Sequence, residues 1–588
     1  MKVKKKNRLL LVTNLLAITA LVLASIPVSA QTGAEGTPTP PPLTRLAADS
    51  SVYLPFIVRP ASPDLVVGAF ETTQAVQNLN NTVPLVAGKP TVLRVYVQTN
   101  FDTRSGVYVS LSATRNGTPL TGSPMTRGPL TITPSWLRGN LSNSFNFTLP
   151  PTWLSGSVTL QIRVDPNNAI IEGSESNNLT TTVANFIEVP TLDVKVVPIE
   201  YEDFYIYPPA SSDYLEPGLL RMFPIGSARV TRRAYITWSQ TLAISNSWSN
   251  LLSRIATIKQ TDNAPEAQIY YGLVPLRAEN GSIWFRSGVA GIGYVGYRAS
   301  AGLANLSPYI NGSEIANHEF GHNLGQEHAN CGVSNPDPSY PYEAGSIGQF
   351  GLQVNNMLLF NPTTYKDIMS YCDPAWISDY TYQALFDDQV AAGAASPNDQ
   401  SVVPSLLVRA SLLEDGTVEM EPVYTFNGRP GASPSESDYV LELLDESGSV
   451  IASYRLPVLT AEGESIKFSS INTTVPLPDK PFAALRITDK GRPAVQRSMA
   501  PASLQTQAMP TLEVETQGAV LSWGQASTPA VVRYQLDGDE TWTTLAVDHL
   551  GGSLELDEQS LPLGMLRFEI ILADQTGSTL TLDWENSR

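Results

Sequence analysis

Hydrophobic and more polar residues alternate with period two through much of the first third of the chain. Leu93, Val95 and Val97 face one way while more polar residues stand between them, and the same pattern returns at 158–164. Alternation of this kind predicts half-buried β-strands. Residues 61–190 are therefore predicted to form a β-sandwich.

The pattern changes over residues 191–397, where helical and strand periodicities occur together. Apolar residues recur at i, i+3, i+4 and i+7 in one stretch, which indicates a helix, while other stretches are short and almost wholly apolar, which indicates buried strands. The predicted elements are a helix at 248–255, a buried strand at 269–274, a Gly-rich strand at 289–297 and a helix from Ser313 to Leu324.

Strand patterns return after residue 397 and continue to the end of the chain. A Pro-rich junction at 501–510 separates two modules, so 398–505 is predicted to be one β-sandwich and 506–588 a second, similar to fibronectin or immunoglobulin domains. The predicted fold class is thus multidomain, with one α/β (α+β) domain flanked by all-β immunoglobulin-like or fibronectin-like sandwiches.

The first sixty residues carry targeting and linker signals. Residues 1–30 combine a basic start, an apolar run and a small-residue site ending at Ala30, which predicts a secretory signal peptide cleaved there. A transmembrane anchor is the alternative, and it is disfavoured because polar residues interrupt the run and Pro27 closes it. Residues 31–60 predict a Pro-rich linker. We expect a secreted, extracellular protein without a transmembrane anchor.

Composition excludes some partners. The 588 residues carry a formal net charge of -18, and only 16% are charged. An acidic surface repels phosphate backbones and anionic lipid, so no nucleic acid is expected as a partner.

Three of the four histidines fall within one short window, at His318, His322 and His328. On a helix His318 and His322 project from the same face, so both imidazoles can bind one Zn²⁺ ion. Glu319 is turned away from that position and can flank a metal-bound water. Gly325 permits a positive φ that ends the helix and returns His328 as a third ligand. Three ligands leave a position open, which is typical of catalytic zinc.

These residues resemble the signature of the metzincin zinc endopeptidases, HExxHxxGxxH followed by a Met-turn. The resemblance implies zinc ligation by the three histidines, a general base at Glu319 and an apolar floor at Met369. It also implies that Tyr371 acts as a fifth ligand or oxyanion donor, although a plain packing role stays open. The family fold places an edge strand above the cleft, and 289–297 is the candidate.

Two further features of this region have alternative interpretations. Trp376 either lines the pocket for the residue after the scissile bond or belongs to the core. Cys331 and Cys372 are the only cysteines and flank the site. In an exported protein they most simply form one disulfide, and direct zinc ligation is the less favoured alternative.

The first predicted sandwich contains three short motifs, Asp64-Leu65-Val66-Val67, Asp165-Pro166-Asn167-Asn168 and Glu175-Ser176-Asn177-Asn178. These motifs resemble those of the bacterial adhesion-related module CARDB.

The predicted function is a secreted zinc endopeptidase that hydrolyses extracellular proteins or glycoproteins, with a cell-surface or polysaccharide ligand as a candidate partner of the β-modules. The alternative is a zinc-containing adhesion or scaffold protein without turnover. Calcium has no strong motif, and Asp337 and Glu343 are its weak candidates.

Overall fold

The computed structural model describes most of the chain after residue 61. The described residues are 62–201, 211–242, 245–277, 282–286, 288–305, 311–394, 401–463, 466–501, 509–515, 518–557, 560–576 and 579–587. The signal peptide predicted at 1–30 and the linker predicted at 31–60 lie outside them. Within the described residues, no helix has the length and apolar character needed to cross a membrane.

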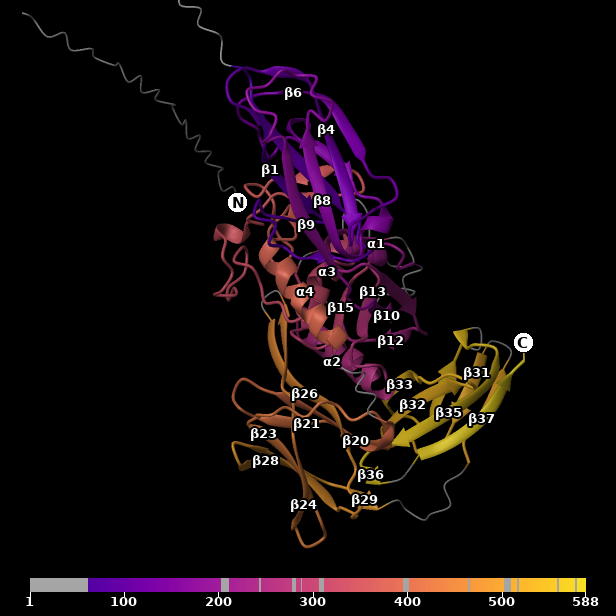
Figure 1. Cartoon of the computed structure of the whole chain (residues 1–588). Coiled ribbons are helices and arrows are strands. Elements are labelled where there is room, and N and C mark those ends of the chain that lie inside the picture. Colours follow the sequence, from indigo (N-terminus) through magenta and orange to yellow (C-terminus); the bar gives the residue numbers. More distant parts are fainter. Residues whose placement is uncertain are drawn as a thin grey trace, which may run out of the picture. The chain divides into compact units, whose positions relative to one another are not determined.

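The first part of the described chain is a sandwich of two antiparallel-rich sheets (Figure 1). Side chains from both sheets, among them Val95 and Leu160, are fully buried in one shared core, as the period-two pattern predicts. One sheet contains β1 (Leu65–Thr73), β3 (Val92–Thr99) and β7 (Phe145–Thr148); the other contains β2 (Leu85–Val86), β9 (Leu179–Ile187), β8 (Gly156–Val164), β4 (Arg104–Arg115), β5 (Thr118–Pro119) and β6 (Met125–Ile132).

Parallel strands follow in the middle of the chain. β10 (Leu192–Tyr201) pairs in parallel with β11 (Ala228–Arg232), β12 (Ile236–Trp238) and β13 (Ile269–Val274), and β13 pairs in parallel with β15 (Ala299–Leu303). β14 (Gly291–Tyr294) is antiparallel to β15. The strand predicted at 269–274 coincides with β13.

Helices lie against these strands, and their bounds are α1 (Leu215–Met222), α2 (Ser245–Thr261), α3 (Gly312–Asn323) and α4 (Asp379–Ala394). Tyr271 of β13 shares a core with Phe320 of α3. Its neighbour Tyr270 lies in a second core together with Trp248 of α2. Successive strand residues point to opposite faces, so α2 and α3 cover opposite faces of β13.

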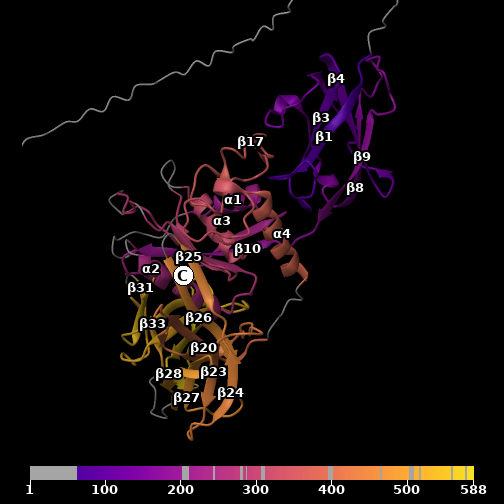
Figure 2. The same ribbon diagram turned by 90° about the vertical axis from the view of Figure 1, so that its left-hand side faces the viewer.

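The sheet does not end at β14. On its other edge β14 pairs with β25 (Leu459–Gly463), and the ladder continues through β26 (Ile466–Pro476), β20 (Val403–Leu412), β21 (Val418–Met420) and β22 (Tyr424–Gly428). Together these strands form one 11-stranded sheet. Figure 2 shows the orange strands β25 and β26 beside the magenta and pink elements of the middle region.

The remaining elements belong to smaller sheets and turns. They are β23 (Tyr439–Leu444), β24 (Val450–Arg455), β27 (Ala484–Asp489) and β28 (Arg492–Ser498); β30 (Thr511–Glu515), β31 (Gly518–Ser522) and β34 (Ser553–Leu556); β32 (Ala530–Leu536), β33 (Thr543–His549), β35 (Gly564–Leu572) and β37 (Thr579–Asn586); the pairs β16 (Gly351–Gln353) with β17 (Leu358–Phe360), β18 (Lys366–Asp367) with β19 (Ala375–Trp376), and β29 (Ala500–Pro501) with β36 (Gln575–Thr576); and the short helices Leu141–Asn143, Pro151–Trp153 and Glu343–Gly345.

The predicted fold class is wrong. The structure is mostly β, with 44% of residues in strands and 13% in helices, and its described residues contain only four α-helices. No separate α/β domain of metzincin type is evident among them. The physical reason is the pairing of β14 with β25, because one hydrogen-bonded ladder joins the middle region to strands of the following β-rich region.

Two element predictions also need correction. The strand predicted at 289–297 is shorter, and it is not an edge strand, because β14 is paired on both sides. The helix predicted from Ser313 begins at Gly312, and Asn311 is its N-cap, with a side-chain oxygen that accepts a hydrogen bond from the Glu314 amide.

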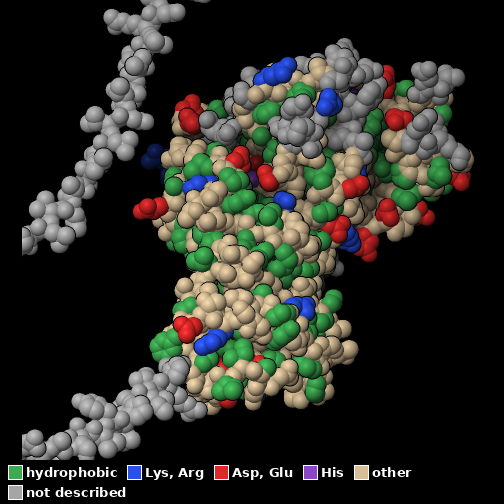
Figure 3. Space-filling model, turned by 90° about the horizontal axis from the view of Figure 1, so that it is seen from above, with side chains coloured by type: hydrophobic (Ala, Val, Ile, Leu, Met, Phe, Trp, Pro, Cys, Tyr) green, Lys and Arg blue, Asp and Glu red, His purple; other side chains and the backbone are tan. Residues whose placement is uncertain are grey.

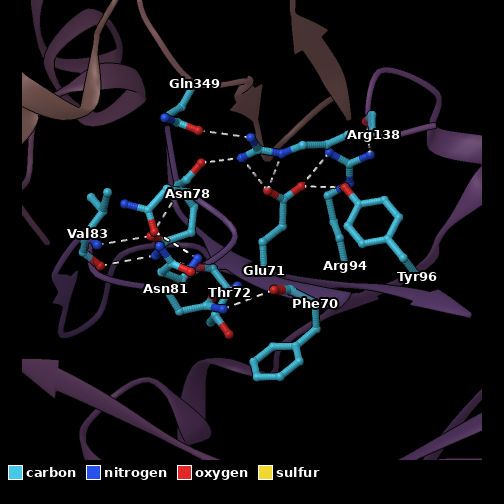
Figure 4. A network of polar contacts seen from close by, with 12 residues as sticks. Phe70, Glu71, Thr72, Asn78, Asn81, Val83, Arg94, Tyr96, Arg138 and Gln349 are labelled. Atoms are coloured by element: carbon cyan, nitrogen blue, oxygen red, sulfur yellow. Dashed lines mark hydrogen bonds and ion pairs between the residues drawn. The ribbon is translucent and has the colours of Figure 1, made fainter. Parts of the chain in front are cut away.

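A buried polar network links the first sandwich to the residues before β16 (Figure 4). Glu71 Oε1 accepts hydrogen bonds from Arg94 Nη1 at 2.7 Å and Tyr96 Oη at 2.6 Å. Glu71 Oε2 accepts one from Arg138 Nη2 at 2.7 Å, and Arg138 Nη1 donates to Gln349 Oε1 at 3.0 Å. A carboxylate that is 2% exposed thus has charged partners for both oxygens.

Candidate metal centre

Helix α3 carries the first part of the candidate site. Its apolar residue Phe320 packs edge-on against Tyr271 of β13, with the ring centroids 5.0 Å apart. Asn317 Nδ2 donates to the Gly218 carbonyl of α1 at 3.1 Å. These contacts fix the rotation of α3 about its axis, and they leave the face bearing His318 and His322 turned toward the loops that follow the helix.

The three predicted histidines meet through one ring nitrogen each. Nε2 of His322 lies 3.2 Å from Nε2 of His318 and 3.1 Å from Nε2 of His328. Ligands at about 2.05 Å around a tetrahedral Zn²⁺ stand about 3.3 Å apart. Among the described residues, these three buried histidines are the one group of His, Cys, Asp or Glu side chains arranged so that it could hold a metal ion.

The other ring nitrogen fixes the tautomer of two of these histidines. Nδ1 of His318 lies 2.7 Å from the Ile368 carbonyl oxygen, and Nδ1 of His322 lies 2.7 Å from that of Gln326. A carbonyl oxygen can only accept, so each Nδ1 carries the proton and each Nε2 presents its lone pair. The backbone therefore aims both lone pairs at the same point.

Burial keeps the imidazoles of His318 and His322 neutral. It lowers the pKa of His318 to about 3, with the charge of His328 acting in the same direction and the contact with Ile368 opposing it. Burial likewise lowers the pKa of His322 well below its usual value. A neutral imidazole is the form that binds a metal.

Glu319 lies beside this cluster with an incomplete set of partners. It is 4% exposed, and its Oε2 has no hydrogen-bond partner. Burial raises the pKa of the Glu319 carboxyl well above its usual range. An orphaned carboxylate oxygen in a buried place costs free energy, and a bound cation with its water would offset that cost. The residues present therefore fit a metal ion.

Strand β14 runs along Glu319 at very close range. A Cβ atom on Gly291 would lie 2.4 Å from Glu319 Oε1, and one on Gly293 would lie 3.0 Å from Oε2. Both positions need glycine because the Glu319 carboxylate occupies the space that a side chain on either residue would fill. The alternating glycines of this strand thus place Glu319 between α3 and β14.

The turn after α3 returns the chain to the site. Gly325 has a φ of +86°, its amide donates to the His322 carbonyl at 2.8 Å, and the Gln326 amide donates to the Gly321 carbonyl at 3.0 Å. This is the double hydrogen bond of a Schellman C-cap. The structure thus places Gly325 at the end of the helix and brings His328 back to His318 and His322.

Met369 lies directly beneath the helix. It is 1% exposed, and a Cβ atom on Gly321 would lie only 2.3 Å from its Sδ. The Ala329 amide donates to the Met369 carbonyl at 2.9 Å. The segment containing Met369 therefore supports both α3 and the loop that carries His328.

Cys331 and Cys372 form the predicted disulfide. The Tyr371 amide donates to the Cys331 carbonyl at 3.0 Å, so a backbone hydrogen bond runs beside the bridge. The Tyr371 ring is 4.7 Å from the ring of His328 and 5.6 Å from that of His318. Tyr371 thus lies next to two of the three histidines.

Two residues that the sequence interpretation missed hold these parts in place. Asn323 Nδ2 donates to the carbonyls of Tyr294, Tyr297 and Ala299, tying the end of α3 to the β14–β15 turn. Asp367, fully buried, accepts from the Met369 amide at 2.8 Å. Their signal in the sequence is weak, because each is a single polar residue that belongs to no recognised motif spacing.

Other predicted residues have structural roles. Trp376 is 2% exposed, stacks on Phe360 at 3.9 Å and donates from Nε1 to the Ala75 carbonyl, so it belongs to the core. Asp337 accepts a hydrogen bond from Tyr380 Oη at 2.7 Å, and Glu343 is exposed. The structure does not bring these two calcium candidates together with other acids in a metal-binding group of the described residues.

A cavity lies away from this centre. Its volume is about 990 Å³, and its walls come from α2, β12 and the C-terminal strands β31, β33 and β34.

On the face shown in Figure 3, charged side chains are scattered among tan and green atoms.

The family model that matches this chain covers the first sandwich. The CARDB family model matches residues 62–182. A solved CARDB domain from Pyrococcus furiosus is 18% identical, covering 22% of this chain and 97% of that chain with a TM-score of 0.16. A domain of a candidate cell surface protein from Methanosarcina acetivorans is 26% identical, covering 21% and 93% with a TM-score of 0.15. No curated protein matches the chain. The family match ends before α3, and residues 62–182 form a CARDB domain.

Proposed function

We propose that this chain is a secreted, zinc-dependent endopeptidase that cleaves extracellular proteins or glycoproteins. The observation that carries the proposal is the convergence of three Nε2 atoms beside a buried Glu319 whose Oε2 lacks a partner. A purely structural zinc site has four protein ligands and needs no base beside it. The resemblance to the metzincin motif supports the same activity.

In this proposal His318, His322 and His328 hold one Zn²⁺ ion. The ion supplies Lewis-acid activation of a water molecule and of the scissile carbonyl. Glu319 accepts a proton from the attacking water and then donates it to the leaving amine. We assign to Tyr371, whose ring lies 4.7 Å from that of His328, the role of orienting the substrate carbonyl. No covalent acyl-enzyme is required.

The test compares Glu319→Gln with Glu327→Gln in the full chain. Gln keeps the size of Glu but cannot accept the proton, so we expect casein cleavage to fall by about 10²–10⁴-fold while zinc content stays at one ion per chain. Glu327 is exposed, so Glu327→Gln should leave the cleavage rate unchanged. Equal activity of Glu319→Gln and wild type would contradict the mechanism.

The second candidate is an adhesion or scaffold protein that contains zinc without turnover, and the CARDB domain is the observation in its favour. A zinc-loaded chain that cleaves neither casein nor a glycoprotein such as mucin, yet binds cells or polysaccharide, would support it. The unpartnered Glu319 oxygen favours the peptidase.

A further inference from the structure

The edge of β14 lies next to the catalytic glutamate of the proposed peptidase. Gly291 and Gly293 point their Hα atoms at Glu319, and the Gly296 amide donates to the His322 carbonyl at 2.8 Å. An extended peptide binds a sheet by adding to such an edge through main-chain hydrogen bonds. In the proposed peptidase a substrate would therefore lie along the part of β14 that precedes its pairing with β25, at Gly291 and Ile292.

A segment from the following β-rich region already occupies part of that edge. β25 pairs Glu462 with Gly293 and Ala461 with Tyr294. The Val295 amide donates to the Thr460 carbonyl at 2.9 Å. The outer edge of β14 is therefore hydrogen-bonded from Gly293 to Val295 by the chain itself.

This closure is part of the core. Ala461 is fully buried, Leu459 is 7% exposed, and both share a hydrophobic core with Ile292 and Tyr294 of β14. Tyr294 Oη also lies within hydrogen-bond distance, 2.8 Å, of Ser470 Oγ on β26. Displacing β25 would expose these buried side chains, so β25 stays in place when a substrate binds.

The direction of β25 identifies which part of a substrate it excludes. β25 is antiparallel to β14, so its earlier residue Thr460 lies at Val295 and its later residue Glu462 lies at Gly293. With its scissile bond beside Glu319, which lies against Gly291 and Gly293, a substrate strand of the same orientation would place the residues before that bond at Tyr294 and Val295. Those positions are taken, and only the residues at and after the bond could pair with β14.

We infer that β25 is a specificity element that denies strand pairing to the residues before the scissile bond, so that substrates are recognised through the residues after it. This inference rests on the proposed peptidase function. The structural feature that carries it is the pairing of β25 with β14 directly beside Glu319.

The test uses the zinc-loaded full chain and synthetic peptides built around the bond in casein that it cleaves fastest. One series keeps six residues after the bond and varies those before it from one to six, and the other series does the reverse. We expect kcat/KM to change by less than about threefold in the first series and to fall by at least about tenfold on trimming in the second.

A matched pair of variants tests the role of β25 itself. Alternate residues of an antiparallel strand direct their amides to the same neighbour, so Glu462, two residues after Thr460, directs its amide to β14. Glu462→Pro removes that N–H and weakens the pairing, while Glu462→Ala keeps it. We expect residues before the bond to increase kcat/KM in Glu462→Pro alone.

The outcomes separate the two levels of the proposal. Cleavage with a rate that rises at least about tenfold as residues are added before the bond would overturn the inference and leave the peptidase standing. No cleavage of any peptide would remove the peptidase and the inference with it. If Glu462→Pro does not fold, the wild-type peptide series still decides.

Discussion

At the scale of single residues, the site depends on a glycine inside a helix. Glycine costs about 1 kcal/mol relative to alanine in a helix interior, so its presence in α3 needs a reason. Gly321 supplies one, because the helix passes so close to Met369 that no side chain fits.

The first residue-scale prediction concerns this contact. Gly321→Ala should push Met369 away, cost about 1–3 kcal/mol of unfolding free energy and weaken zinc binding. Denaturant unfolding and zinc titration measure both effects. Met369→Ala in the same chain should restore much of the loss, because it makes room for the new methyl group. Full additivity of the two substitutions would contradict the proposed contact.

A second residue-scale prediction concerns the anchor of the Met369 segment. Asp367 accepts from the Met369 and Ser378 amides through its two oxygens, each at 2.8 Å. In Asp367→Asn one of the two carboxylate oxygens is replaced by an NH₂ group, which would face a backbone N–H that it cannot accept from. We therefore expect a loss of about 1–3 kcal/mol in unfolding free energy. Unfolding curves of Asp367→Asn and of Asp373→Asn, which changes an exposed acid nearby, provide the comparison.

Residues of the site differ in how far the sequence predicts them. His318, Glu319 and His322 were predicted from their local spacing, which puts both histidines on one face of a helix and matches a known motif. Gly321 and Asp367 act through contacts with residues that are distant in the sequence or through backbone amides, and neither leaves a periodic signal. Site residues that lie a few positions apart in the sequence can therefore be predicted from it. The residues that support them by long-range contacts can be identified only once the fold is known.

At the scale of elements, the disulfide joins the loop after His328 to the segment after Met369. Replacing both cysteines, Cys331→Ser with Cys372→Ser, should cost roughly 2–4 kcal/mol of unfolding free energy. It should also weaken zinc binding, because His328 would lose the support of this loop. Zinc affinity equal to that of wild type would show that the backbone hydrogen bond between Tyr371 and Cys331 is sufficient.

Elements were predicted best where both faces are buried. β13 begins and ends at the predicted residues. A continuous apolar run of this short length indicates a buried strand, because a helix would need a longer run. β14 does not, because glycines carry little pattern and pairing with β25 depends on a segment far along the chain. That same pairing made the predicted fold class wrong.

At the scale of the whole molecule, buried charges tie its parts together. Lys89 of the CARDB domain is 1% exposed and donates from Nζ to the Leu220 carbonyl of α1 at 2.5 Å. Burial lowers the pKa of Lys89 to about 7. The docking of the first sandwich onto α1 therefore contains a group that titrates near neutrality.

This pKa gives a prediction with a definite sign. Between pH 7 and about 10.5 an unfolded Lys89 is protonated and the folded one is not, so stability should rise with pH by at most about 1.4 kcal/mol per unit. Below pH 7 both states are protonated, and the contribution to the slope vanishes. Unfolding free energies of wild type and Lys89→Met across this range provide the measurement. An unchanged slope in Lys89→Met would contradict the assignment.

The ladder from β14 to β25 also has a consequence for how damage in one part of the molecule affects another part. The Val295 amide can exchange its hydrogen with solvent only when that ladder opens, so its exchange rate reports on a sheet that extends to β20 and β21. Damage to the later strands, by a nick or a destabilising substitution, would loosen the strand beside Glu319. Loss of the proposed peptidase activity would then begin far from the histidine cluster.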